Sequence, residues 1–156
     1  MDDALLDRAL GLAREARANG DHPFGALLAV DGVVVAEAVN RVTTSSDLTA
    51  HAETELVHLL EREGRLDQLS LGVVYASCEP CPLCIGAMFW AGARHIVFGL
   101  SAARLNALST EPGGSVYGFT ITAAELAAAT TSPMRVEGPF HEDAAAAVHD
   151  GFWHAG

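Results

Sequence analysis

Three cysteines lie within the stretch SCEPCPLC, residues 77–84, and the chain contains no others. Each is three residues from the next, at positions 78, 81 and 84. Thiols in this pattern can hold a metal ion, form a redox pair with one thiol to spare, or pack as small hydrophobic side chains. The rest of the sequence has to decide among these three uses.

The length and composition predict one globular domain over residues 1–156, too short for two domains of ordinary size. Half of the residues are apolar and 19% are charged. No apolar run approaches the roughly 20 residues of a membrane helix, so we expect a soluble chain. The N-terminus starts with acidic residues and lacks a secretory signal, which favours the cytoplasm. In that reducing compartment a disulfide framework is disfavoured, and metal binding or catalysis gains support.

The charge balance disfavours polyanionic partners. The formal net charge is −11, the chain has only nine Lys and Arg, and no segment concentrates several of them. Affinity for nucleic acid rests largely on basic groups that neutralise phosphates. We therefore expect a small neutral ligand rather than nucleic acid.

The periodicity of the first hundred residues predicts alternating helices and strands. Asp31-Gly32, a dipeptide typical of tight hairpin turns, separates two β-rich runs. Gly20 and Gly64 are helix stop signals, and Pro80 marks a helix entrance, where its missing N–H is no loss. We expect helices over 2–20, 52–64 and 81–92 and strands over 25–30, 33–39, 71–77 and 95–100.

The pattern weakens after Leu100. We expect a short helix over 103–108, a loop over 109–118, a helix over 123–129, a strand over 134–138 and a terminal helix over 141–153. Strands that alternate with helices after a hairpin predict a three-layer α/β domain.

Two predicted helices begin with residues that can bind a metal. His51 opens one of them in the motif HAE, and Cys81 opens the other. Cys84 is three residues after Cys81, so the two share a helical face, and the positive end of the helix dipole lowers the pKa of thiols there. One histidine with two cysteines is a catalytic zinc set that leaves the fourth tetrahedral position for water. Glu53, two residues after His51, can supply the base.

The motif HAE followed by PCPLC matches the H-x-E and P-C-x-x-C signature of zinc-dependent nucleobase deaminases. The sequence resembles the cytidine deaminase superfamily from about residue 5 to residue 100. The stretches HPFGALL, TTSSDLTAHAE, SCEPCPLC and GAMFWAG are most similar to the branch of bacterial guanine deaminases, fungal cytosine deaminases and tRNA adenosine deaminases. This resemblance implies an α/β fold, a three-layer αβα sandwich with a central mixed five-stranded sheet.

The resemblance implies Zn²⁺ as the cofactor, held by His51, Cys81 and Cys84. Zinc lowers the pKa of its bound water toward neutrality. Glu53 then takes up the proton, passes it to the ring nitrogen and helps ammonia leave. Cys78 lies at a strand end and is expected to be a packed thiol. A closed structural site of three cysteines and His51 would leave no place for water, and Glu53 argues against it.

Further residues are candidates for binding the substrate. The family counterpart of Asn40 hydrogen-bonds the substrate, whereas a bare sequence feature of this kind is more often a turn residue. Phe24, in HPFGA, is expected to be a stacking wall, with a core aromatic as the alternative. Ala52 lies between the ligand and the base. Glu79 is expected either to orient the zinc helix or pocket, or to be an ordinary surface residue.

The C-terminus also resembles a pocket-closing segment, because guanine and cytosine deaminases close their sites with C-terminal acids and aromatics. Glu142 or Asp143 would accept hydrogen bonds from an amidine-like edge of the substrate, and Phe152 or Trp153 would cover its ring. The alternative is a terminal helix that uses these aromatics for packing.

Three functions remain open. The first is hydrolytic deamination of a free nucleobase or close analogue, with guanine as the first choice and cytosine, isoguanine or a nucleoside as alternatives. The second is tRNA adenosine deamination, which the acidic composition opposes. The third is a non-catalytic zinc module that binds a partner protein, which Glu53 opposes. The resemblance also implies a homodimer paired through the zinc-bearing helices, with Phe89 and Trp90 in the apolar face.

Overall fold

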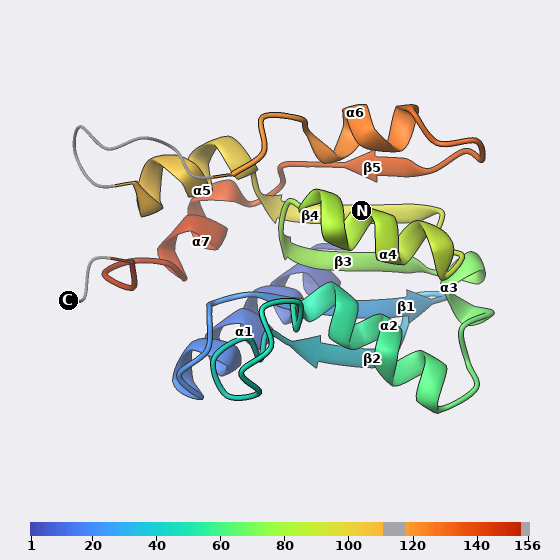
Figure 1. Cartoon of the computed structure of the whole chain (residues 1–156), viewed down its shortest axis with the longest axis horizontal. Helices are drawn as coiled ribbons and strands as arrows, with labels where there is room; N and C mark the ends of the chain where they lie inside the picture. The colour runs from blue at the N-terminus through green and yellow to red at the C-terminus, as the bar shows by residue number, and fades with distance from the viewer. Residues whose placement is uncertain (111–117, 154–156) are drawn as a thin grey trace.

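The computed structural model describes residues 1–110 and 118–153. Within these ranges the chain forms one five-stranded sheet with helices on both faces (Figure 1). The strands are β1 (Gly25–Val30), β2 (Val33–Val39), β3 (Val73–Cys78), β4 (His95–Leu100) and β5 (Arg135–Glu137). The helices are α1 (Asp3–Ala18), α2 (Ala52–Arg62), α3 (Gln68–Leu71), α4 (Pro82–Trp90), α5 (Ala102–Ser109), α6 (Ala123–Ala128) and α7 (Glu142–Ala147).

The sheet is mixed, as expected, and its strand order is β2-β1-β3-β4-β5. β1 pairs antiparallel with β2 and with β3, whereas β3, β4 and β5 run parallel. The predicted hairpin between β1 and β2 is confirmed. Asp31 and Gly32 both have positive φ, 49° and 76°, which is the backbone that a type I′ turn requires.

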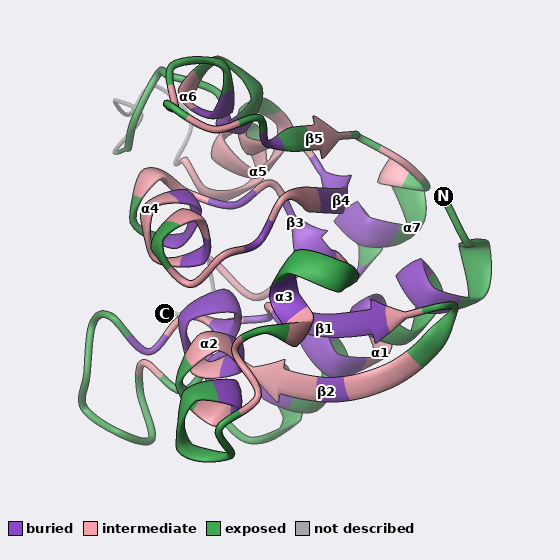
Figure 2. Cartoon of the chain, turned by 90° about the vertical axis from the view of Figure 1, so that its right-hand side faces the viewer, coloured by how far each residue is buried: buried purple, intermediate pink, exposed green. Residues whose placement is uncertain are grey.

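The three central strands β1, β3 and β4 are largely buried between helices on the two faces of the sheet, which makes the domain a three-layer αβα sandwich (Figure 2). Along β1, Ala26 and Leu28 pack in the cluster that contains α2, α4 and α6. Leu27 and Ala29 point the other way and pack against α1. Period-two alternation with apolar residues on both faces explains why the whole run GALLAV is apolar.

Three sequence expectations are corrected by the structure. α4 begins at Pro82, which occupies its first turn, so Pro80 lies before the helix rather than at its entrance. The strand expected over 71–77 begins at Val73, because Leu71 ends the one-turn helix α3. The terminal helix ends at Ala147, and residues 148–153 form turns.

Most of the loop expected over 109–118 lies outside the described residues. In the two described stretches of the chain, no helix has both the length and the apolar character to cross a membrane.

α1 lies directly on β1 at Gly25. A Cβ built at this position would stand 2.4 Å from the Leu12 Cβ, 2.6 Å from the Ala13 nitrogen and 2.7 Å from the Ala9 oxygen. Two of these atoms belong to the helix backbone, so they cannot move aside as a flexible side chain could. The absence of a side chain at Gly25 therefore sets how closely α1 approaches the sheet.

We expect Gly25→Ala to lower the free energy of unfolding by about 1–3 kcal/mol or more, because the added methyl group overpacks this contact. Gly11→Ala is the matched control. It makes the same change within α1, where the nearest atom to the new Cβ is a side-chain nitrogen of Arg8 at 3.6 Å. It should stabilise the protein by about 0.5–1 kcal/mol through helix propensity. Denaturant unfolding of both variants measures the difference, and equal effects would contradict this account of Gly25.

Candidate active site

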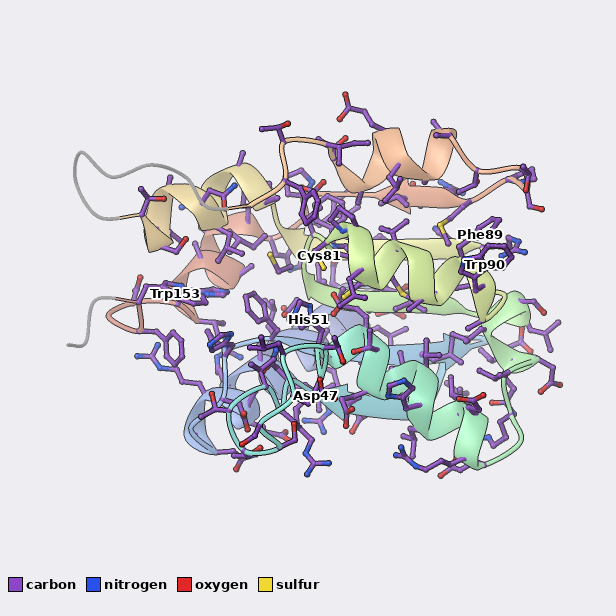
Figure 3. All side chains as sticks on the ribbon, viewed as in Figure 1. Asp47, His51, Cys81, Phe89, Trp90 and Trp153 are labelled. Atoms are coloured by element: carbon purple, nitrogen blue, oxygen red, sulfur yellow. The ribbon has the colours of Figure 1, made fainter. Side chains whose placement is uncertain are left out.

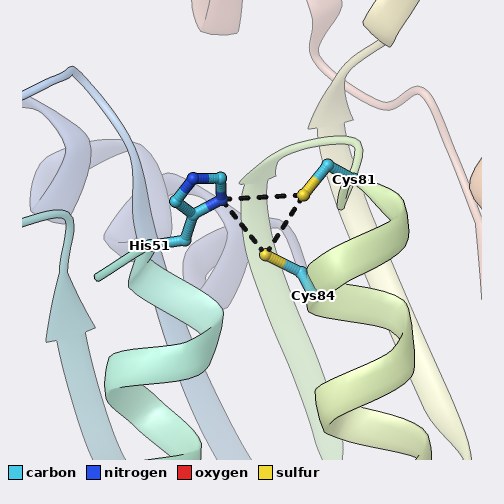
Figure 4. Close-up of side chains that lie close together, drawn as sticks. All are labelled: His51, Cys81 and Cys84. Carbon is cyan, nitrogen blue, oxygen red and sulfur yellow. Dashed lines mark hydrogen bonds between the residues drawn. The ribbon is translucent and has the colours of Figure 1, made fainter. Parts of the chain in front are cut away.

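Two helix N-termini converge on one edge of the sheet and bring three metal-binding side chains together (Figure 4). His51 is the N-cap residue of α2, and Cys81 is the N-cap residue of α4. Cys84 lies one turn further along α4. Neither N-cap side chain forms the usual capping hydrogen bond to its own helix. Both side chains instead point into the space between the two helices.

The three donor atoms have the spacing of a tetrahedral zinc site. The two sulfurs are 3.6 Å apart, and the His51 Nδ1 atom is 3.6 Å from the Cys81 Sγ and 3.4 Å from the Cys84 Sγ. Zn–S bonds of about 2.3 Å and Zn–N bonds of about 2.0–2.1 Å in a tetrahedron require separations of roughly 3.8 Å and 3.6 Å. The donor set therefore fits Zn²⁺ by chemistry and by geometry, with one position left for water or substrate.

The electrostatics of the three side chains also suit a cation. The hydrogen bond with Cys84 and the contact with His51 lower the pKa of Cys81 to about 4, so this thiol is ionised at neutral pH. The hydrogen bond with Cys81, together with burial, raises the pKa of Cys84 well above its usual range. The hydrogen bond to Cys81 raises the pKa of His51. Because metal ligands must be deprotonated, binding of a cation here releases protons.

Glu53 lies beside this group on the first turn of α2. Its side chain is only 7% exposed, and the Cys84 thiol donates a hydrogen bond of 3.3 Å to its Oε2 atom. Burial raises the pKa of this carboxyl group. The structure thus places a buried carboxyl group next to the three donor atoms, where it can exchange protons with a bound water.

The four residues line a cavity of about 150 Å³. This is smaller than the roughly 300–1,000 Å³ of sites for drug-sized ligands, so it suits a small ring. Among the described residues its lining comprises Phe24, His51, Glu53, Cys78, Glu79, Cys81, Cys84 and Leu105. Sequence reasoning missed Leu105, on α5, because no local motif marks it.

Cys78 and Glu79 follow β3 into the cavity and have different partners. Cys78 is buried at the end of the strand, and its burial raises the pKa of the thiol. It lies outside the group of close donor atoms. Glu79 accepts hydrogen bonds from the backbone nitrogens of Ala102, at 2.9 Å, and Ala123, at 2.8 Å. Glu79 therefore ties the starts of α5 and α6 to the cavity wall.

Asn40 and Ala52 are close to the site in sequence but are not among the described residues that line the cavity. Asn40 is buried, and its Oδ1 atom accepts a hydrogen bond of 3.0 Å from the Val42 nitrogen, as a turn residue does. Ala52, the first residue of α2, is fully buried and packs in the core.

The structure does not bring the two C-terminal acids to the cavity. Glu142 accepts hydrogen bonds from both the backbone nitrogen and the hydroxyl of Ser101. The Asp143 side chain is 93% exposed and forms an ion pair of 2.7 Å with Arg104. Both acids thus bind α5 and the residue that caps it. They do not lie where a substrate edge would meet them.

Of the two C-terminal aromatics, Trp153 contacts the cavity wall, whereas Phe152 contacts His22 and Trp153. The ring centroid of Trp153 is 6.1 Å from that of Phe24, which lines the cavity, and 5.5 Å from that of His22. Figure 3 shows Trp153 to the left of His51 and Cys81, on the side away from Phe89 and Trp90. Trp153 does not itself line the cavity. Since α7 ends at Ala147, turns rather than a continuous helix place this indole.

Comparison with known proteins agrees with this geometry. The chain is 38% identical over 156 residues to a probable cytosine deaminase of Schizosaccharomyces pombe, a match that covers 99% of this chain and 94% of that protein. It is 41% identical over 97 residues to the guanine deaminase of Bacillus subtilis, covering 62% of each chain.

A solved structure from studies of A-to-I editing by tRNA:A34 deaminases superposes with a TM-score of 0.73 at 27% identity. This superposition covers 94% of this chain and 99% of the other. Residues 1–100 match the model of the cytidine and deoxycytidylate deaminase zinc-binding region. The chain therefore belongs to the cytidine and deoxycytidylate deaminase family and is a zinc-dependent deaminase.

Proposed function

We propose that residues 1–156 act as one cytoplasmic domain that hydrolytically deaminates a free nucleobase and releases ammonia. The observation that carries this proposal is the meeting of His51, Cys81, Cys84 and Glu53 on a cavity of about 150 Å³. A cavity of this size suits a bare ring better than a nucleoside, whose sugar would have to extend outside it. The three free thiols suit a reducing compartment.

The chemistry requires a water molecule, a metal and a proton carrier. A zinc ion held by His51, Cys81 and Cys84 would lower the pKa of the water and stabilise negative charge that develops on its oxygen. Glu53 takes the proton from the attacking water as its oxygen bonds to the ring carbon that carries the amino group. Glu53 then gives this proton to the adjacent ring nitrogen. It later moves the remaining hydroxyl proton from the tetrahedral carbon to the amino group, which leaves as ammonia as the C–N bond breaks and the carbonyl forms.

Cytosine is the first substrate to test, and guanine is the second. The full-length match to the probable cytosine deaminase includes the C-terminal third, whereas the match to guanine deaminase covers 62% of the chain. Guanine, the first choice on sequence, keeps the support of the 41% identity to the guanine deaminase over 97 residues. Isoguanine and nucleosides remain less favoured candidates.

Two other functions have less support. Transfer RNA editing is favoured by the structural likeness to a tRNA deaminase, but the net charge of −11 opposes binding to a polyanion. A non-catalytic zinc module has no use for a buried carboxyl group such as Glu53 beside an open coordination position.

Within the site, we assign Phe24 to stacking on the base, because its ring lines the cavity. We assign Glu79 to holding the wall formed by α5 and α6, through its two backbone hydrogen bonds. Asn40, through its side-chain amide nitrogen, and Ala52, through its backbone nitrogen, remain candidates for hydrogen bonds to the substrate.

We also propose that the chain is a homodimer paired through α4. This helix contains no charged residue and is apolar on all sides, a pattern typical of a buried helix. Leu83 and Trp90 are nevertheless 44% and 85% exposed in the single chain. Figure 3 shows Phe89 and Trp90 at the end of α4 remote from the metal-binding residues. A neutral, self-complementary face lets two acidic copies meet without opposing like charges.

Metal analysis tests the ligand assignment. We expect Cys81→Ser to reduce the zinc content well below one ion per chain, because a hydroxyl is a poor replacement for a thiolate ligand. Cys78→Ala, at the neighbouring thiol that lies outside the donor group, should keep one ion per chain. The reverse pattern would show that the ligands are assigned wrongly.

Ammonia release from a panel of substrates tests the reaction. We expect the zinc-loaded protein to deaminate cytosine fastest and guanine second among cytosine, guanine, isoguanine, cytidine and a tRNA with adenosine at the wobble position. Fastest turnover of cytidine or of the tRNA would rule out a free base as the substrate.

The control for this assay is Glu53→Ala, which removes the proton carrier and leaves all three ligands. It should keep its fold and zinc, because alanine is favourable in a first helical turn. Its turnover should fall by about 10²- to 10⁴-fold, the contribution of a general acid–base group. Near wild-type turnover with zinc retained would exclude this mechanism.

Light scattering on eluted peaks tests the dimer. The wild-type chain should elute as a dimer at micromolar concentration, and Trp90→Glu should give monomers, because it places a charge in the paired apolar face. Leu71→Glu is the matched control, since this residue is also exposed and apolar but lies on α3. A wild-type monomer, or dissociation by both variants alike, would contradict pairing through α4.

A further inference from the structure

A cluster of aromatic rings from two distant segments borders the active-site cavity. His22 and Phe24 precede β1, whereas His149, Phe152 and Trp153 follow α7. The Phe24 ring centroid lies 5.3 Å from that of His149 and 6.1 Å from that of Trp153. Phe24 lines the cavity. The rings of His149 and Trp153 pack against Phe24, so their positions determine how this part of the cavity wall is supported.

His149 is the buried polar member of this cluster, with 3% of its surface exposed. The Trp153 Nε1 atom is 3.2 Å from the His149 Nδ1 atom, and the two rings are nearly parallel, at 11°. An indole N–H can only donate, so Nδ1 must be the unprotonated, accepting nitrogen of a neutral imidazole. Burial and the charge of Arg17 lower the pKa of His149 to about 4, which keeps the ring neutral at neutral pH.

Arg17 fixes the backbone on both sides of His149. Its guanidinium donates hydrogen bonds of 2.7 Å to the carbonyl oxygens of Val148 and Asp150, and it lies 5.8 Å from the centroid of the Phe152 ring. The turn that carries His149 is therefore tied to α1. With the backbone held in this way, the imidazole is a fixed acceptor for the indole.

We propose that His149 is a positioning residue that holds the Trp153 indole against Phe24 and so fixes the wall of the cavity on which the base stacks. This inference rests on the proposed function, because it takes Phe24 to face the base. A wall that contacts the base equally in the ground state and the transition state contributes uniform binding. Loss of its support therefore raises KM and leaves kcat unchanged.

His149→Phe and His149→Asn separate the hydrogen bond from the ring. Phenylalanine keeps an aromatic ring without the acceptor, whereas asparagine keeps an oxygen at the position of Nδ1. We expect His149→Phe to raise KM by about 2- to 10-fold, the effect of losing one neutral hydrogen bond. Its kcat and zinc content should stay unchanged, and His149→Asn should have a KM closer to wild type. His58→Phe makes the same change at a half-exposed position on α2 and should leave KM unaltered.

Fluorescence gives a readout that needs no substrate. In a Trp90→Phe background Trp153 is the sole tryptophan, and His149→Phe should shift its emission to longer wavelength as the indole gains contact with water. His149→Asn should not. This shift would support the positioning role even if no base in the panel were deaminated. The fluorescence measurement therefore tests the His149–Trp153 contact, and the substrate panel tests the proposed function separately.

Two results would overturn the inference. One is a folded His149→Phe variant with unchanged KM and unchanged Trp153 emission. The second result would come from Trp153→Phe, which replaces His149→Phe as the test if His149→Phe does not fold. Trp153→Phe, which removes the donor from a partly buried position, should then raise KM by a similar factor. An unchanged KM in Trp153→Phe would show that the contact does not position the wall.

Discussion

The site depends on two helices that begin at the same edge of the sheet. β3 ends at Cys78, and the chain turns directly into α4, whose first residues carry Cys81 and Cys84. α2 begins beside it with His51 at its N-cap. Serine, threonine, aspartate and asparagine stabilise such positions best, typically by about 1 kcal/mol. Both caps instead hold residues that bind metals, so local helix stability is given up for the position of the donor atoms.

Much of the fold up to residue 100 follows from local sequence patterns, because its elements are long and periodic. The hairpin at Asp31-Gly32 needs positive φ at both positions, and the dipeptide Asp-Gly is typical of turns with this backbone. The C-terminal segment differs. Alanine-rich residues after His141 are typical of a helix, yet α7 ends at Ala147. Arg17, more than a hundred residues away, binds the carbonyl oxygens that a longer helix would have used, and no local pattern shows this.

The site residues likewise differ in whether local sequence predicts them or distant contacts determine them. His51, Glu53, Cys81 and Cys84 could be predicted because each pair lies within one helical turn, and the topology then brings the pairs together. Leu105 could not, because its place in the cavity depends on Glu79 holding the start of α5. Glu142 and Asp143 are C-terminal acids that the resemblance makes candidates for contact with the substrate. The nearby polar and basic groups of Ser101 and Arg104 bind them to α5 instead.

The extent of the family match also affects the choice of substrate. The family match ends at residue 100, and it includes every residue of the metal-binding group. Proteins named for cytosine, for guanine and for transfer RNA adenosine all resemble this chain. A shared metal-binding half cannot by itself distinguish among these substrates. We therefore infer that other parts of the cavity wall contribute to the distinction. Among the described residues, these are Leu105 on α5 and the rings of His149 and Trp153 that pack near Phe24.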